Sequence, residues 1–196
     1  SAVRITVAQY YTPSGRLIQR KYEDGLDEYY NDLLTTNREA NDSSLVNKPK
    51  FKTKKGREVF GGGGITPDIY ASNKMSFLDK TQSIITHPSR LIFKYANEIK
   101  NNYKTNFKQF NNQTLKNKGK NIAIENFIQW INEEDDSLDI QNLDIEEDWI
   151  YLENRILADI ANALWGKDYY YQTLLKEDNQ FLISLEHMND AKALTD

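Results

Sequence analysis

The chain has 196 residues, of which 39% are hydrophobic and 28% are charged, and its formal net charge is −4 at pH 7. This composition can supply one or two packed domains and argues against a wholly disordered chain. A negative net charge with scattered basic residues gives no reason to expect a nucleic acid as partner. Cysteine is absent, which excludes disulfides, thiolate catalysis and cysteine-ligated metals, and no apolar run is long enough to cross a bilayer.

The first part of the chain has the pattern of β structure. Residues 2–12 alternate apolar and polar side chains and are rich in β-branched and aromatic residues, which predicts a strand with one apolar face. Pro13-Ser14-Gly15 has turn chemistry, and residues 16–21 fit a second short strand. Because this pattern opens directly after Ser1 and the strands are few, we expect the sheet to continue in an upstream segment of a longer protein.

A polar stretch and a glycine-rich segment follow. Residues 22–50 predict a short helix at about 25–35 and then an exposed loop. Residues 51–60 predict a β-hairpin with Lys55-Gly56 at its turn. The run Gly61-Gly62-Gly63-Gly64 offers no side chains to pack, so it indicates a backbone that needs unusual torsion angles or a very close neighbour.

From about residue 72 the apolar spacing becomes helical. The longest expected helix covers 145–165, with Asp144 as its N-cap and Gly166 as its stop. A last helix is expected at about 178–190, with Phe181, Leu182, Leu185 and Met188 facing inward. Pro88 is expected in the first turn of a helix. Further apolar stripes lie at Ile92, Tyr95, Ile99 and Tyr103, and at Ile124, Phe127, Ile128 and Ile131.

These patterns predict an α+β chain with two parts. Residues 1–71 form a short β-rich part, and residues 72–196 form a mostly α-helical C-terminal domain. The periodicity changes from two residues to between three and four near residue 72, and this change sets the boundary.

No pattern in the chain supplies a catalytic or metal centre. His87 and His187 are the only histidines, and neither has zinc-site spacing. Ser14 has no visible base and is expected to bond its own turn. A calcium-loop pattern from Asp135 to Glu146 fails because Ile140 replaces the glycine that the loop requires. The glycine run lacks the following helix of a phosphate loop. We therefore expect no metal and no cofactor.

Two stretches resemble C-terminal processing peptidases, also called tail-specific proteases. Residues 4–19 read RITVAQYYTPSGRLIQ, like the strand and turn that follow the catalytic lysine of that family. Residues 56–68 read GREVFGGGGITPD, like the family's glycine-rich segment. Residues 157–185 resemble the helical tail of envelope-associated members from the Bacteroidetes group. The motif residues carried over as structural are Tyr11, Thr12, Pro13, Gly15, Gly61, Gly62, Gly63, Gly64, Pro67 and Asp68.

The resemblance implies a serine endopeptidase with a Ser–Lys dyad, in which a neutral lysine is the general base. The family's Ser, Lys and PDZ module all precede the strand at residues 2–12, so no catalytic residue is expected in this chain. Lys54, Lys55 and Lys74 match nothing in the dyad motif. The implied partners are the upstream peptidase chain, its polypeptide substrates and a possible second copy. The implied location is the periplasm or cell envelope.

Two other interpretations stay open. In the first, the chain is a helical interaction or dimerisation module without a peptidase context. In the second, it is an independent hydrolase, which the absence of a recognisable nucleophile–base pair disfavours.

Overall fold

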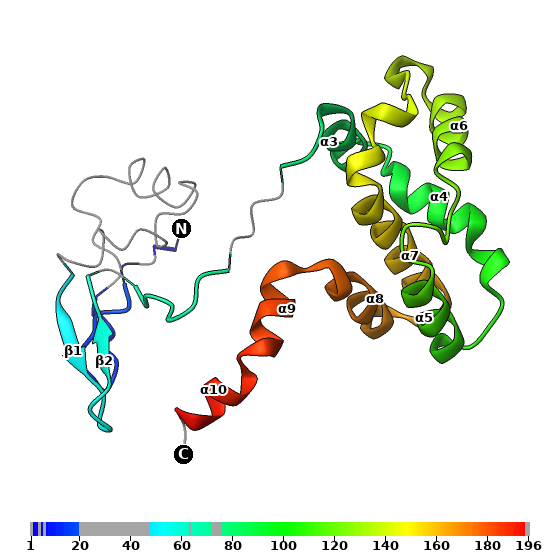
Figure 1. Ribbon diagram of the computed structural model, residues 1–196. Coiled ribbons are helices and arrows are strands. Elements are labelled where there is room, and N and C mark those ends of the chain that lie inside the picture. The colour runs from blue at the N-terminus through cyan, green and yellow to red at the C-terminus, as the bar shows by residue number, and fades with distance from the viewer. Residues whose placement is uncertain are drawn as a thin grey trace. The chain divides into compact units, whose positions relative to one another are not determined.

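The computed structural model describes residues 2, 3, 5, 7–19, 48–62, 64–71 and 76–194, and the statements below concern these residues. The chain divides into two compact units, Ser1–Lys74 and Met75–Asp196, which are considered separately (Figure 1). The described part is mostly helical, with one two-stranded sheet. The predicted helix at 25–35 lies outside the described residues.

The sheet of the first unit is an antiparallel hairpin. Strand β1 (Lys50–Lys52) pairs with β2 (Glu58–Phe60), with Phe51 opposite Val59. The turn needs Gly56, whose φ of +83° lies in the left-handed region. Val59 is the buried residue of the pair, at 4% exposure. The predicted hairpin at 51–60 is therefore confirmed.

The predicted strand at residues 2–12 does not form among the described residues. Only an isolated bridge between Tyr11 and Leu17 is present. The side chains of Val3, Ile5 and Val7 are 80%, 76% and 91% exposed. A strand needs a neighbour for its backbone hydrogen bonds, and an alternating pattern cannot supply one. The second strand at 16–21 is likewise reduced to the bridge at Leu17, with Arg20 and Lys21 outside the described residues.

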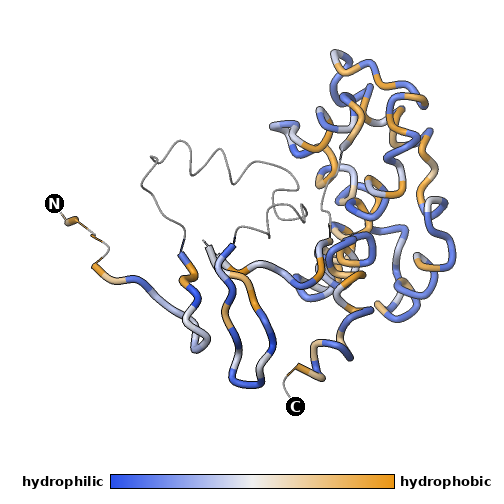
Figure 2. The backbone as a smooth tube through the Cα atoms, turned by 60° about the vertical axis from the view of Figure 1, so that its left-hand side comes forward, coloured by the Kyte–Doolittle hydropathy of each residue, from blue (hydrophilic) through white to orange (hydrophobic). Residues whose placement is uncertain are grey.

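The second unit is helical. Figure 1 shows its α-helices, and Figure 2 shows apolar and polar stretches alternating along them. Helix α7 packs against α4 and α8. The α-helices are α3 (Asp79–Thr86), α4 (Leu91–Ile99), α5 (Phe107–Lys116), α6 (Ile124–Glu134), α7 (Trp149–Trp165), α8 (Lys167–Leu174), α9 (Asn179–Glu186) and α10 (Met188–Ala193). The 3₁₀ turns are η1 (Lys100–Tyr103), η2 (Asp136–Leu138), η3 (Asn142–Asp144), η4 (Glu146–Asp148) and η5 (Leu175–Glu177).

The core of this unit follows the predicted apolar stripes. The buried face of α7 carries large apolar side chains at helical spacing, and residues of α4, α5 and α6 pack on it. The predicted stop at Gly166 is confirmed, since its φ is +101°. The fully or nearly buried members include Ile92, Tyr95, Phe110, Phe127, Ile131, Trp149, Leu152, Ile156 and Ile160.

Helix α7 begins at Trp149, so the predicted start at 145 is wrong. Ile145 is fully buried with a non-helical φ of −136°, between two 3₁₀ turns. Asp144 caps η3, because its Oδ2 accepts a hydrogen bond from the Gln141 amide at 2.7 Å. Asp148 flanks α7, and its carboxylate accepts the amide of Leu78 at 2.8 Å. The carboxylates of Asp144 and Asp148 therefore accept hydrogen bonds from backbone amides and do not cap the first turn of α7.

Two further expectations are corrected. Pro88 lies between α3 and α4 and not inside a helix, and α4 starts after Arg90, whose φ is +54°. The predicted helix at 178–190 is broken at His187 into α9 and α10. Its expected inward side chains are exposed. Phe181 is 36%, Leu182 42%, Leu185 51% and Met188 60% exposed. The apolar stripe exists, but the described residues do not cover it.

Candidate functional site

The turn at Thr12–Arg16 is closed by local hydrogen bonds. The Gly15 amide donates to the Thr12 carbonyl at 2.8 Å, and Gly15 has a φ of +88°. The Thr12 hydroxyl accepts the Arg16 amide at 3.2 Å and bonds the Ser14 hydroxyl at 2.9 Å. Tyr11 is 60% exposed, and its hydroxyl donates to Gln9. The Ser14 hydroxyl therefore bonds the Thr12 hydroxyl, and no histidine or lysine of the described residues is shown bonding to it. This is the role of a serine that stabilises its own turn.

The two motifs that carry the peptidase resemblance meet at the Phe51 ring. A Cβ on Gly15 would lie 3.4 Å from this ring, and a Cβ on Gly61 would lie 2.6 Å from it. The Gly61 amide also donates to the Pro49 carbonyl at 2.8 Å, which extends the hairpin. Gly62 and Gly64 have φ values of +94° and +105°. Gly63 lies outside the described residues. Gly15 and Gly61 thus allow the backbone to lie close to the Phe51 ring, and Gly62 and Gly64 adopt torsion angles that other residues rarely adopt.

Replacing Gly61 with alanine should loosen the hairpin. The new Cβ would overlap the Phe51 ring, and forcing such a contact typically costs about 1–3 kcal/mol. Amide hydrogen exchange of β1 and β2 should therefore speed up in Gly61→Ala. The matched control is Gly61→Ala in a Phe51→Leu background, where the added cost should shrink because the ring is gone. Equal costs in both backgrounds would contradict this explanation.

The end of the glycine segment is fixed by polar contacts. The Arg57 guanidinium pairs with Asp68 at 2.6 Å, and Lys48 donates to the Thr66 hydroxyl at 3.3 Å. A cavity of about 200 Å³ lies beside this ion pair. It is lined by Arg16, Arg57, Glu58, Val59, Phe60, Ile65, Thr66, Pro67 and Asp68. Of the predicted structural residues, Pro67 and Asp68 are thus cavity residues.

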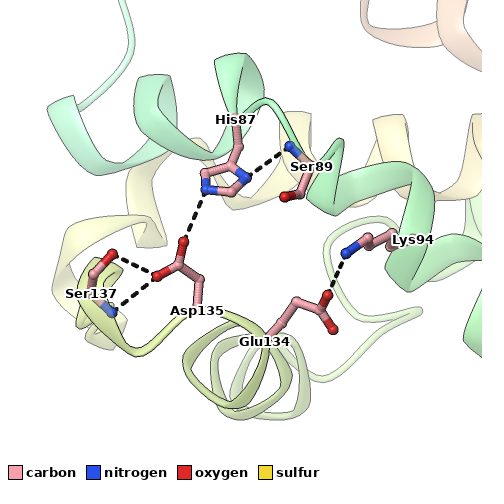
Figure 3. Close-up of polar contacts among 6 residues, drawn as sticks. All are labelled: His87, Ser89, Lys94, Glu134, Asp135 and Ser137. Carbon is pink, nitrogen blue, oxygen red and sulfur yellow. Dashed lines mark hydrogen bonds and ion pairs between the residues drawn. The ribbon is translucent and has the colours of Figure 1, made fainter.

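In the second unit, His87, Asp135 and Ser137 form a hydrogen-bonded chain (Figure 3). His87 Nε2 lies 3.1 Å from Asp135 Oδ2, and the Ser137 hydroxyl donates to Asp135 Oδ1 at 2.6 Å. His87 Nδ1 accepts the amide of Ser89 at 3.2 Å. The imidazole proton therefore sits on Nε2 and points at the carboxylate.

This arrangement contains the residues of a catalytic triad in the wrong order. A triad needs the hydroxyl to donate to histidine, whereas Ser137 donates to the carboxylate. The hydrogen bond from Ser137, aided by His87, lowers the pKa of Asp135 below its ordinary value. The hydrogen bond between His87 and Asp135 joins the end of α3 to the end of α6. An ion pair between Lys94 and Glu134 joins α4 to α6 nearby. We interpret the cluster as structural.

The calcium-loop candidates give no metal site. Asp135, Ser137 and Asp139 bond protein groups, and among the described residues no three His, Asp or Glu side chains gather as metal ligands. His187 bonds Asp190 at 2.9 Å, within one helical turn.

A buried carboxylate that sequence reasoning missed lies on α7. Glu153 is only 2% exposed, and its oxygens accept the amides of Gly119, Asn121 and Ile122 at 2.7–3.0 Å. It also accepts the Asn121 side chain at 3.2 Å. A signal was available, since Glu153 stands four residues after Trp149 on the apolar face of the helix.

Lys176 lines a pocket together with Thr114, Asn121 and the Glu153 carboxylate. Its ammonium donates to the Thr114 hydroxyl at 3.2 Å. Burial lowers the pKa of Lys176 to about 8, and the charge of Glu177 opposes that shift. No spacing in the sequence indicated this environment. Nearby, Lys118 pairs with Glu177 at 2.7 Å.

The partly buried ammonium of Lys176 predicts a pH-dependent stability. Between about pH 8 and 10.5, the unfolded chain holds the Lys176 proton and the folded chain has released it. The contribution of this group to the free energy of unfolding therefore rises with pH across that window. The difference in urea stability between the wild type and Lys176→Met should grow with pH there. For Lys108→Met, at an exposed lysine of α5, the difference should stay flat. A flat difference for Lys176→Met would refute the explanation.

Comparisons of the chain with protein-family models, curated proteins and solved structures find no match. Among the described helices, none has the length and apolar character needed to span a membrane. The peptidase resemblance therefore stays a prediction that rests on the two motifs.

Proposed function

We propose that this chain is the C-terminal portion of a Ser–Lys serine endopeptidase of the C-terminal processing type. It contributes structure and carries no catalytic residue. The observation that carries the proposal is the ordered pair of motifs at residues 4–19 and 56–68. The contacts of Gly15 and Gly61 with the Phe51 ring support it, because they give both motifs one shared packing role.

The exposed edge of the first unit supports the same proposal. Val3, Ile5 and Val7 present apolar side chains that are at least 76% exposed, in a segment with the alternation of a strand. Pairing with an upstream strand would satisfy the backbone and bury this face. In this proposal, residues 1–71 complete the catalytic sheet and residues 72–196 form a helical accessory domain. The partners are the upstream core and PDZ module and polypeptide substrates, in the periplasm or cell envelope.

The test compares the chain alone with the chain extended by its upstream reading frame. The extended protein should cleave a labelled polypeptide near its C-terminus, and replacement of the upstream serine or lysine by alanine should abolish cleavage. The 196-residue chain should be inactive. An upstream frame without a serine and a lysine, or cleavage by the purified chain alone, would overturn the proposal.

One observation favours a second function, a helical interaction or dimerisation module. The apolar side chains of α9 and α10 are exposed among the described residues, and such faces commonly mark interaction sites. A self-associating chain should elute from gel filtration well above 22.8 kDa. Leu185→Asp should then restore monomeric elution, whereas Glu186→Gln, at the neighbouring exposed position, should not.

A further inference from the structure

Lys176 of η5 places an amine at a small pocket of the second unit. The pocket has a volume of about 30 Å³, and Lys176 and Thr114 both line it. Among the described residues, the Lys176 nitrogen has one hydrogen bond, to the Thr114 hydroxyl at 3.2 Å. The neighbouring Glu177 carboxylate pairs with Lys118 at 2.7 Å. Because an ammonium has three N–H donors, the charged form of Lys176 is poorly satisfied here.

The directions of the hydrogen bonds leave a lone pair available on the neutral amine. The Thr114 hydroxyl donates its only proton to the Asn111 carbonyl at 3.1 Å, so it can only accept from Lys176. A neutral amine donates one N–H to this hydroxyl and keeps its lone pair free of it. Burial lowers the pKa of Lys176 to about 8, so about half of the amine is neutral at that pH. An ordinary lysine, with a pKa of about 10.4, is then almost wholly protonated.

The pocket limits the electrophile that can reach this amine. Its volume of about 30 Å³ has room for about two water-sized groups, which matches the carbon and oxygen of an aldehyde. Leu115 and Ile150 also line the pocket, and both side chains are exposed. They offer an apolar rim on which an unbranched alkyl chain can be buried.

The charges around the pocket disfavour an anionic electrophile. When Lys176 is neutral, the charged groups among the described lining residues are the carboxylates of Glu153 and Glu177 and the ammonium of Lys118. Negative charge is therefore in excess, and it repels an aldehyde that carries its own carboxylate. An uncharged aliphatic aldehyde meets no such repulsion.

We propose that Lys176 is a nucleophilic amine that condenses with an unbranched aliphatic aldehyde, whose alkyl chain lies on Leu115 and Ile150. The lone pair of the nitrogen forms a bond to the carbonyl carbon, and the electrons of the C=O double bond move to oxygen. The aldehyde oxygen then leaves as water with the two hydrogens of the amine, and a C=N bond remains. The proposal goes beyond the peptidase assignment and does not depend on it.

The test treats the complete chain with butanal and cyanoborohydride, which reduces the imine to a stable secondary amine. Peptide mapping by mass spectrometry gives the initial rate at each lysine. At about pH 8, Lys176 should react at least about tenfold faster than Lys108, an exposed lysine of α5, because more of it is neutral. The ratio of the two rates should fall as the pH rises to about 10.5, where Lys108 also becomes neutral. A ratio near one at pH 8 would overturn the proposal.

Two further aldehydes and two variants test the pocket itself. Formaldehyde has no alkyl chain, and glyoxylate carries a carboxylate, so the preference for Lys176 over Lys108 should be smaller with each than with butanal. Leu115→Ala should lower the butanal preference by about threefold or more and leave the formaldehyde preference unchanged. Leu143→Ala, at an exposed leucine of η3 that does not line the pocket, should change neither. A glyoxylate preference equal to that of butanal, or an unchanged butanal preference in Leu115→Ala, would also overturn the proposal.

Discussion

Replacing Glu153 with alanine is expected to lower the free energy of unfolding of the helical unit by about 3–5 kcal/mol. The carboxylate accepts three backbone amides and one side-chain amide from residues 119–122 while being 2% exposed. Its removal leaves those donors without acceptors and leaves a cavity beside α7. The segment between α5 and α6 should loosen with it, because Glu153 supplies its hydrogen bonds.

Urea denaturation followed by tryptophan fluorescence measures this effect, since Trp130, Trp149 and Trp165 all lie in the second unit. Glu153→Gln should cost less than Glu153→Ala, because the glutamine carbonyl oxygen can still accept some of these hydrogen bonds. It should still cost stability, because the new NH₂ group would face a backbone N–H that needs an acceptor. Glu186→Ala, at an exposed position of α9, should stay within about 0.5 kcal/mol of the wild type. A loss below 1 kcal/mol in Glu153→Ala would show that water replaces the carboxylate.

Elements specified by neighbouring residues were predictable from the sequence. The hairpin at 51–60 depends on Lys55-Gly56 at its turn and on alternation in its short strands. Helix α6 and the stop at Gly166 depend on spacing and on one left-handed glycine. These signals need no distant partner, so the sequence pattern and the structure agree.

Elements that depend on distant groups were not predictable. The alternation at residues 2–12 is genuine, but a strand also needs a neighbour, and the described residues provide only the bridge from Tyr11 to Leu17. Helix α7 starts later than predicted because Ile145 is buried between two 3₁₀ turns and the Asp148 carboxylate accepts a backbone amide 70 residues away. The helical spacing at 178–190 predicts which residues share a face, but it does not predict whether another element covers that face.

In the candidate sites too, the sequence indicated local features and did not indicate contacts between distant residues. The glycine run indicated a close approach, and the close neighbour of Gly61 is Phe51, which only the folded chain identifies. Arg16 lies inside the first motif, but the other residues that line its cavity come from 57–60 and 65–68, which the motif itself does not indicate. His87 and Asp135 are 48 residues apart, so no spacing rule could join them.

Replacing Phe110 with alanine is expected to cost the helical unit about 3–5 kcal/mol. Phe110 is 1% exposed, and its ring contacts those of Trp165 and Tyr103 at centroid distances of 5.0 and 5.6 Å. Truncation removes the transfer energy of the ring, leaves a cavity and deletes two aromatic pairs that join α5 to α7 and η1.

Urea denaturation again measures the loss, and the fluorescence of Trp165 should respond because its ring loses a direct neighbour. Phe110→Leu should cost less, because a branched aliphatic side chain refills much of the volume. Leu115→Ala, at a 54% exposed position of the same helix, should change stability by no more than about 0.5 kcal/mol. Equal losses at positions 110 and 115 would contradict an aromatic anchor for α5, whereas a large loss at 110 alone would establish one.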